Sequence, residues 1–307
     1  MDSIWDITDK CNLGCMHCYM EERNRGALSD EQELGIVNGL ADIGVEKVFI
    51  GGGEPFMKPG LEGVMAQLAD RGIRTGLVTN GTRVDYGLVE RAEPESVQVS
   101  IDGGREFHDW LRMSRCHDAA MDAVRALSGY SVSVGVSTTL MKGNVGDLAG
   151  LVEDIYGYAD GYRANLLVPV GRAGGMRQRM LEPEEVIEAA GKLYELGRGH
   201  PGIRFEYPRE YPARRALLSG EIGRRVYAQN AGHCECGGSV AIQPNGNVLP
   251  CVFLQDRVIG NAAEAPLSEI MAAYRPEAGS CSCAHSATCR PCPALSRGGR
   301  DAYCIKV

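Results

Sequence analysis

Short runs of β-branched and other apolar residues alternate with longer amphipathic stretches over the first two thirds of the chain. This alternation is typical of βα units, in which helices join the strands of a parallel sheet. The predicted strands are Ile4–Thr8, Lys47–Ile50, Thr75–Thr79, Val97–Ile101, Ser131–Thr138 and Asn165–Val168. The predicted helices are Asp30–Ile43, Leu61–Arg71, His117–Leu127, Val145–Tyr156 and Glu184–Leu196.

Two helix starts carry local signals. Ser29 precedes the first predicted helix and Gln32 follows three residues later, which is a capping-box pattern. Pro183 stands in the first turn of the last predicted helix, where a missing N–H costs nothing.

Six βα units are too few to close an eight-stranded barrel, so we expect an α/β fold with a partial (β/α)6 barrel resembling a TIM barrel. Parallel strands carry their chemistry at their carboxyl ends. The loops at these ends are rich in polar residues and glycine, and they are Asp9–Cys11, Gly51–Pro55, Asn80–Gly81 and Asp102–Gly103.

The alternation stops after the last predicted helix. Three prolines interrupt the stretch 197–231, which predicts a linker. Beyond it, Val240–Gln243 and Val248–Val252 flank Asn245-Gly246, a strong hairpin signal. We therefore expect a barrel over residues 1–200, a linker over 201–232 and a small cysteine-rich domain over 233–307.

Charge and hydropathy exclude several classes of partner. The 307-residue chain has a formal net charge of -8 and no basic run, so nucleic acid is a poor candidate. No apolar stretch reaches the roughly 18 residues that a membrane span needs, and the N-terminus lacks a signal pattern. We therefore expect no membrane contact and a cytoplasmic location.

Twelve cysteines are many for such a chain, and in a reducing compartment they are more often metal ligands or catalysts than disulfides. Three lie near the N-terminus and one, Cys116, stands alone. The other eight lie in the last part of the chain, at Cys234, Cys236, Cys251, Cys281, Cys283, Cys289, Cys292 and Cys304.

The front group is Cys11, Cys15 and Cys18. Three thiolates satisfy three irons of a 4Fe-4S cluster and leave the fourth iron open to an outside ligand, which favours chemistry over electron storage. The alternative is a structural zinc site that uses His17 as its fourth ligand.

The segment Cys11-Asn-Leu-Gly-Cys15-Met-His-Cys18-Tyr19 resembles the C-x3-C-x2-C signature of the radical S-adenosylmethionine (SAM) superfamily. Gly52-Gly53-Glu54-Pro55 resembles the second motif of that family. The resemblance implies that the open iron binds the amino and carboxylate groups of SAM. A reduced cluster then cleaves SAM to methionine and a 5'-deoxyadenosyl radical, which abstracts hydrogen from a substrate.

The same resemblance assigns residues to SAM. Gly52, Gly53 and Glu54 would hold the methionyl amine, because glycine allows close backbone approach and a carboxylate suits an ammonium group. His17 would pack near the adenine. The nucleoside would lie near further family elements, which are Asn80, Ser100, Asp102 and Gly171-Arg172-Ala173.

The back cysteines resemble the SPASM extension of peptide-modifying radical SAM enzymes, which holds two auxiliary 4Fe-4S clusters. By order along the chain, the first cluster would take Cys234, Cys236, Cys251 and Cys292. The second would take Cys281, Cys283, Cys289 and Cys304. The spacing departs from the usual pattern at Cys281-x-Cys283 and Cys289-x2-Cys292, so one cluster with spare thiols is the alternative. Such clusters would carry electrons or serve a structural role.

Cys116 lies just past the fourth predicted strand, where a thiol hydrogen is well placed for transfer to a carbon radical. A radical epimerase needs such a donor, whereas the alternative is a buried structural cysteine. His108, Asp109 and Arg112 resemble a family stretch near the substrate, and a solvated helix start explains them equally. Asp160, Arg163 and Tyr207 are polar candidates without a specific role.

The sequence leaves the substrate open. The SPASM resemblance favours a peptide, with epimerisation, oxidation, crosslinking or formylglycine formation as the outcome. The chain begins ten residues before Cys11, and we expect no leader-binding domain there, which favours a sugar or aminoglycoside instead. A flavodoxin or ferredoxin would supply electrons. The alternative of another class is a non-catalytic iron-sulfur electron carrier.

Overall fold

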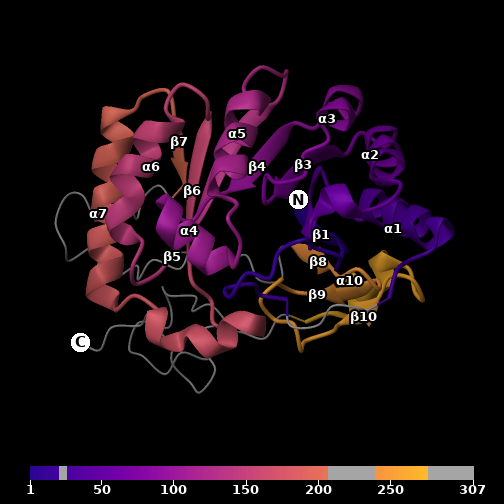
Figure 1. The fold of residues 1–307 in the computed structure, drawn as a ribbon. Coiled ribbons are helices and arrows are strands. Elements are labelled where there is room, and N and C mark those ends of the chain that lie inside the picture. Colours follow the sequence, from indigo (N-terminus) through magenta and orange to yellow (C-terminus); the bar gives the residue numbers. More distant parts are fainter. Residues whose placement is uncertain (21–25, 207–238, 276–307) are drawn as a thin grey trace.

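The computed structural model describes residues 1–20, 26–206 and 239–275 (Figure 1). Ten strands form one sheet in the order β10-β9-β8-β1-β2-β3-β4-β5-β6-β7. The parallel strands are β1 (Asp2–Thr8), β2 (Lys47–Gly52), β3 (Arg74–Thr79), β4 (Ser96–Ser100), β5 (Ser133–Leu140), β6 (Gly161–Leu166), β7 (Arg204–Glu206) and β8 (Val240–Ile242). The antiparallel strands are β9 (Asn247–Leu249) and β10 (Gly260–Asn261).

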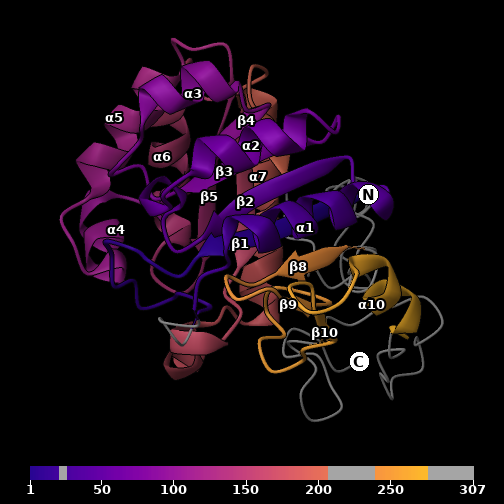
Figure 2. The same cartoon turned by 90° about the vertical axis from the view of Figure 1, so that its right-hand side faces the viewer.

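Helices follow each of the first six strands, and all of them except α4 cover the outer face of the curved sheet (Figures 1 and 2). They are α1 (Asp30–Asp42), α2 (Leu61–Ala69), α3 (Tyr86–Ala92), α4 (Arg105–Arg112), α5 (His117–Leu127), α6 (Leu148–Ile155) and α7 (Pro183–Gly199). Short 3-10 segments are η1 (Pro55–Met57), η2 (Val145–Asp147) and η3 (Gly171–Arg179). This arrangement confirms the predicted partial (β/α)6 barrel.

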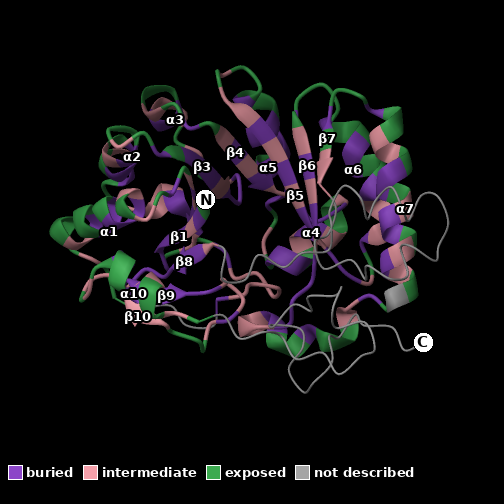
Figure 3. Ribbon diagram, turned by 180° about the vertical axis from the view of Figure 1, so that it is seen from behind, coloured by how far each residue is buried: buried purple, intermediate pink, exposed green. Residues whose placement is uncertain are grey.

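The burial pattern explains why the strands read as apolar runs. In β4, β5 and β6 buried and half-buried residues alternate, as in Val97, Val99, Val134 and Val136, which are buried toward the helices. The apolar core therefore lies between the sheet and its helices, and the exposed residues lie on the outer side of those helices (Figure 3). No helix in the described ranges is both long and apolar enough to cross a bilayer.

Local predictions held at the capped helices. Ser29 and Gln32 form the capping box of α1, and Pro183 opens α7. The boundaries differ elsewhere. β6 begins at Gly161, four residues before the predicted start at Asn165, and α7 continues to Gly199. Residues 204–206, which the sequence placed in a linker, form β7 beside β6, and residues 207–232 lie outside the described ranges.

The predicted Asn-Gly hairpin extends the barrel sheet. β8 and β9 pair in antiparallel fashion around Gly246, and β8 adds to the free edge of β1, with Ser3 opposite Val240. The Ser3 hydroxyl also donates to the Val240 carbonyl (2.9 Å). Helix α10 (Leu267–Ala273) then packs on α1. The C-terminal hairpin is therefore joined to the strand that leads into Cys11.

The hairpin depends on glycine at position 246. Gly246 has a φ of +85°, and a Cβ there would lie 2.8 Å from the Asn261 side-chain oxygen. We expect Gly246→Ala to destabilise the fold by about 1–2 kcal/mol from the left-handed backbone alone, and by more because of the clash. The midpoint of anaerobic thermal unfolding checks this.

Gly44→Ala is the matched control. Gly44 has a φ of +75°, but a Cβ there would meet no atom within 4 Å. It should lower the midpoint by less than Gly246→Ala does. Equal effects of the two variants would contradict the role given to the packing of Gly246 against the β10 segment.

Candidate functional site

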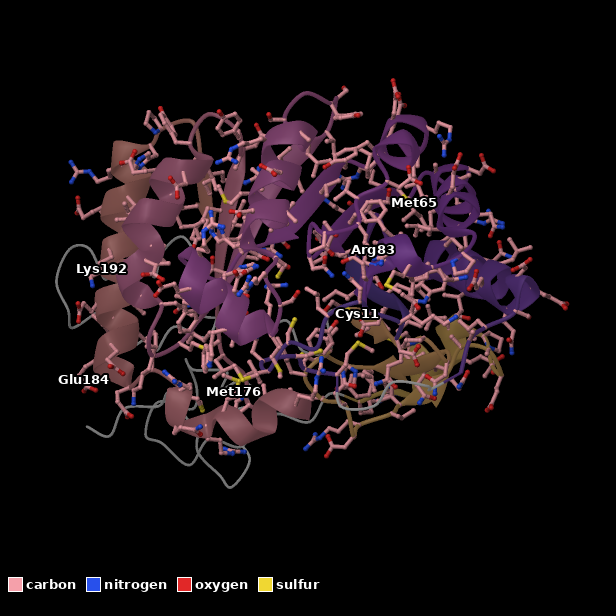
Figure 4. All side chains as sticks on the ribbon, viewed as in Figure 1. Cys11, Met65, Arg83, Met176, Glu184 and Lys192 are labelled. Atoms are coloured by element: carbon pink, nitrogen blue, oxygen red, sulfur yellow. The ribbon has the colours of Figure 1, made fainter. Side chains whose placement is uncertain are left out.

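Five loops meet at the carboxyl edge of the parallel sheet. The loop after β1 carries Cys11, Cys15 and Cys18, which are half-buried and form no disulfide with another described residue. In the view of Figure 4, Cys11 lies between the barrel strands and the β8–β10 hairpin. The loops after β2, β3, β4 and β6 bring Glu54, Asn80, Asp102 and Gly171 to the same edge. The residues predicted near SAM therefore end the strands that surround the three thiols.

The first two loops are locked together by their backbones. Gly53 N–H donates to the Thr8 carbonyl (2.7 Å), and Glu54 N–H donates to the Lys10 carbonyl (2.8 Å). A Cβ on Gly53 would lie well inside contact distance of the Lys10 oxygen, and one on Gly52 would lie 2.5 Å from the Thr8 oxygen. The glycines thus allow the protein's own loops to meet, a role that the sequence argument had assigned to ligand approach.

Glu54 is fully buried but well provided with donors. Its carboxylate accepts from the Thr79 hydroxyl (2.7 Å) and from the N–H groups of Asn80 (2.9 Å) and Phe56 (3.5 Å). Burial raises the pKa of Glu54, while these hydrogen bonds oppose the rise. The carboxylate therefore joins the loops after β2 and β3 beside the thiols.

Asn80 ties the third loop to the cysteine loop. Its Nδ2 donates to Asn12 Oδ1 (3.1 Å) and lies 3.9 Å from the Cys11 sulfur, to which Leu13 N–H also donates (3.4 Å). Hydrogen bonds to ligand sulfurs are one of the means by which proteins tune iron-sulfur clusters. The donor set around Cys11 therefore fits a thiolate-held cluster.

Cys15 is the middle cysteine of the loop after β1 and is half-buried. Burial raises its pKa to about 11, against the pull of the Arg112 guanidinium. The backbone N–H of the next residue, Met16, donates to the Leu111 carbonyl at the end of α4 (2.9 Å). Helix α4 therefore holds the middle of the cysteine loop.

A buried ion pair stands behind this loop. Arg112 donates through Nε and Nη2 to Asp102 Oδ2 (2.9 and 2.8 Å), and the side chains are 6% and 1% exposed. Asp102 Oδ1 accepts from Thr139 N–H (3.0 Å), and His17 Nε2 lies 3.4 Å from Oδ2. Burial would raise the pKa of Asp102, but Arg112, His17 and His108 hold it at about 2. The pair is therefore ionised at neutral pH.

His17 and Arg172 carry buried polar atoms without a hydrogen-bond partner among the described residues. These atoms are His17 Nδ1 and Arg172 Nε. Burial lowers the pKa of His17 to about 4, so its ring is neutral at pH 7. Buried polar groups are rarely left unpaired in the absence of a ligand or water. A polar cofactor beside the cysteine loop would therefore fit these two groups.

The Gly171 turn packs on the end of the cysteine loop. A Cβ on Gly171 would lie well inside contact distance of the Tyr19 carbonyl oxygen, and Ala173 N–H donates to the Cys18 carbonyl (3.3 Å). The predicted element Gly171-Arg172-Ala173 therefore meets the thiols. Ser100, which ends β4, is half-buried beside Ser137 of β5.

Cys116 is buried behind α4. Its sulfur lies 3.4 Å from His108 Nε2, while Asp109 Oδ1 accepts from the N–H groups of Cys116 and His117 (2.9 Å each). The Asp102 N–H donates to His108 Nδ1 (3.2 Å), and burial lowers the pKa of His108 to about 3. The neutral ring therefore carries its proton on Nε2 and donates it to the Cys116 sulfur.

This tautomer bears on metal binding. His108, Asp109 and Cys116 each offer a ligand atom within 4.8 Å of the others. A metal needs a free lone pair on His108 Nε2, which the proton there removes. The triad is therefore a hydrogen-bonded thiol. Burial raises the pKa of Cys116, so the thiol keeps its hydrogen at neutral pH.

Other predicted residues lie elsewhere. Asp160 accepts from Val134 N–H (2.8 Å) at the start of β5, the edge opposite the thiols. Arg163 pairs with Glu206 of β7 (2.5 Å). Cys251 is half-buried, forms no disulfide with another described residue and packs against the main core. Tyr207 lies outside the described residues. So do the other back cysteines, which are Cys234, Cys236, Cys281, Cys283, Cys289, Cys292 and Cys304.

Sequence reasoning missed Asn144 and the pairing of Arg112. Asn144 is fully buried, and its Nδ2 donates to the carbonyls of Asp102 (2.9 Å) and Thr139 (2.8 Å). A single Asn in a glycine-containing turn gives no signal of such a role. The sequence placed Arg112 in a stretch near the substrate or at a solvated helix start, and no pattern in sequence links it to Asp102.

Relatives with known names share most of the chain. A Fe-coproporphyrin III synthase of Methanosarcina barkeri (strain Fusaro / DSM 804) is 28% identical over 296 residues, which cover 87% of this chain and 72% of the relative. The mycofactocin maturase MftC of Mycobacterium ulcerans (strain Agy99) is 27% identical over 318 residues, which cover 93% of this chain and 80% of the relative.

Solved structures share the fold. Streptococcus suis SuiB bound to its precursor peptide SuiA superposes with a TM-score of 0.77 at 15% identity, over 100% of this chain and 74% of that one. The enzyme anSMEcpe with bound AdoMet and the Cp18Cys peptide gives a TM-score of 0.67 at 19% identity, over 98% and 90%.

Two family models match the chain. The model of the radical SAM superfamily matches residues 5–155, and that of the SPASM iron-sulfur cluster-binding domain matches residues 234–293. The first range contains the three thiols and the loops around them. The chain therefore belongs to the radical SAM superfamily and carries a C-terminal SPASM domain, with 4Fe-4S clusters and SAM as its cofactors.

Proposed function

We propose that the chain is an enzyme that cleaves SAM reductively and abstracts hydrogen from an unactivated C–H bond of a natural-product substrate. The observation that carries the proposal is the convergence of three half-buried thiols, the Gly53–Glu54 loop and the Gly171 turn at one edge of the sheet. Buried polar atoms of His17 and Arg172 also support the proposal, because they have no hydrogen-bond partner among the described residues and would fit a polar ligand.

Cys11, Cys15 and Cys18 would hold the SAM-binding cluster. When bound and reduced, this cluster supplies the electron that splits SAM into methionine and a 5'-deoxyadenosyl radical. The chain's own residues would orient SAM and shield the radical. The backbone at Gly52 and Gly53 and the Glu54 carboxylate would meet the methionyl amine, and His17, Asn80 and Ser100 would lie toward the nucleoside.

Asp102 acts in this proposal as a positioning residue. Both of its carboxylate oxygens are engaged, one by Thr139 N–H and the other by Arg112 and His17. Its charge therefore fixes the His17 ring and keeps Arg112 close to Cys15. Hydrogen-bonded partners behind metal ligands hold those ligands in a productive orientation.

We propose a peptide as the substrate class and oxidation as the reaction. The support is that the mycofactocin maturase is a relative and that SuiB, named with a precursor peptide, shares the fold. Fe-coproporphyrin III synthase makes a tetrapyrrole the alternative substrate. The auxiliary clusters of residues 233–307 would accept the electron that the substrate radical loses, and a flavodoxin or ferredoxin would supply the first electron.

Epimerisation is the second candidate reaction, and the Cys116 thiol favours it. His108 Nε2–H donates to the sulfur, so the S–H bond points elsewhere and its direction is set by that contact. The thiol stays protonated because burial raises its pKa. A protonated thiol of fixed orientation is what a hydrogen-atom donor to a substrate radical requires.

Gly53→Ala tests the central proposal. The added methyl group pushes the Lys10 carbonyl away and separates the first two loops. We expect the rate of 5'-deoxyadenosine formation from SAM, in the reconstituted and reduced protein, to fall by about 100-fold or more, because small displacements at a reacting centre cost that much.

Gly14→Ala is the control within the same loop, since a Cβ there meets no atom within 4 Å. It should keep most of the activity. A wild-type protein that takes up iron and sulfide but forms no 5'-deoxyadenosine after reduction would overturn the proposed function.

A pair of variants tests the role of Asp102. Arg112→Met alone leaves a buried carboxylate without its partner and should cost about 3–5 kcal/mol of stability. The double variant Asp102→Asn with Arg112→Met removes both charges and should recover most of that loss. If the pair positions His17, the double variant still binds SAM about 10-fold or more weakly.

Thermal unfolding and SAM titration measure the two effects separately. A double variant that is stable and binds SAM as tightly as the wild type would show that the pair serves stability alone. Recovery of stability without recovery of SAM affinity supports the positioning role.

Cys116→Ser and Cys116→Ala test the donor role in deuterated water. Serine keeps an acceptor for His108 Nε2–H, but its O–H bond is too strong to give a hydrogen atom. Both variants should still form 5'-deoxyadenosine and lose the epimer that has gained one solvent deuterium, as seen by mass analysis. Epimer formation by Cys116→Ser would discard the idea, because it would show a structural role.

A further inference from the structure

One aromatic contact joins the cysteine loop to the C-terminal hairpin. Tyr19 follows Cys18 directly, and Phe253 stands two residues after Cys251. The two rings meet edge to face, with centroids 5.9 Å apart and planes at 81°. A short covalent path therefore leads from each ring to a cysteine of a different cluster-binding region.

The Tyr19 ring is held in place from both ends. Its hydroxyl donates to Asp6 Oδ1 on β1 (2.7 Å), and its backbone lies against the Gly171 turn. Phe253 packs against the main core. The two rings are therefore held in contact with each other.

The contact is not needed to dock the hairpin. β8 pairs with β1 from Ser3 to Trp5, and α10 packs on α1, where a Cβ on Gly39 would lie 2.9 Å from Leu267 Cβ. The other ring-ring contacts of the described residues lie within residues 1–206. In the described ranges the Tyr19–Phe253 pair alone carries an aromatic path between the two regions.

We propose that the Tyr19–Phe253 contact is the route for electrons between the cluster on Cys18 and an auxiliary cluster on Cys251. This inference rests on the proposed function, in which both cysteines are cluster ligands. In an oxidation, the substrate radical loses one electron to the auxiliary cluster and one proton to water or a base. That electron crosses the two rings to the cluster on Cys18 and restores its reduced form, so no further oxidant or reductant is consumed.

Neither ring is oxidised on this route. The phenylalanine ring has no hydroxyl whose proton could leave together with an electron, and the Tyr19 hydroxyl donates to Asp6. The rings act by shortening the gap between the loop that carries Cys18 and the hairpin that carries Cys251. The electron crosses where the edge of one ring meets the other. The hydroxyl of Tyr19 should therefore be dispensable, whereas the rings should not.

The test uses the full chain with its clusters reconstituted. Phe253→Leu and Tyr19→Leu remove one ring each, while Phe253→Tyr and Tyr19→Phe keep both. The enzyme is mixed rapidly with less than one equivalent of dithionite, and freeze-quench EPR follows the movement of the reduced signal between the clusters. Tyr86→Leu is the matched control, because it breaks the stacked Tyr86–Tyr130 pair elsewhere in the barrel (5.7 Å).

We expect the exchange rate to fall severalfold in the two leucine variants and to stay unchanged in Phe253→Tyr, Tyr19→Phe and the control. Equal rates in Phe253→Leu and wild type, with both clusters present by iron content and EPR, overturn the inference alone. A Tyr19→Phe variant as slow as Tyr19→Leu would also overturn it, because the phenol would then be the relay. Absence of any auxiliary cluster in the wild type overturns the inference together with the electron acceptor of the proposed oxidation, whereas formation of 5'-deoxyadenosine tests the proposed SAM cleavage separately.

Discussion

A guanidinium and a carboxylate, both removed from water, form the centre around which the loops at the carboxyl edge are arranged. Asp102 lies two residues after the end of β4 and Arg112 ends α4, so their pairing holds the end of α4 close to the carboxyl edge of the sheet. Once there, α4 receives the Met16 N–H at the Leu111 carbonyl. Breaking a buried pair leaves an uncompensated charge, so this geometry tolerates little variation. The cysteine loop thereby gains a rigid support.

Glycine contacts and polar side chains hold the remaining loops together. Backbone hydrogen bonds lock the loop after β1 to the loop after β2, which only works because Gly52 and Gly53 carry no Cβ. Glu54, Asn80 and Asn144 then tie the outer loops to one another. A site made this way is largely assembled before any cofactor arrives, which lowers the ordering cost of binding.

The sequence predicted the barrel because most of its strands and helices have one apolar face. It missed the short helices α3 and α4, and in α4 the buried residues His108, Leu111 and Arg112 are mostly polar, so that no stripe of apolar residues marks it. The start of β6 was missed because Gly161 to Ala164 lacks β-branched residues. Motif spacing located the three thiols and the glycine loop, but the ion pair behind them joins elements that only tertiary structure brings together.

The pairing of β8 with β1 has a consequence for how the molecule is made. The outer edge of β1 pairs with residues 240–242, so during synthesis this edge stays unpaired until those residues have left the ribosome. An unsatisfied strand edge invites association with other chains, and contacts so distant in sequence form slowly. The order of synthesis therefore favours late closure at the side of the sheet that leads into Cys11.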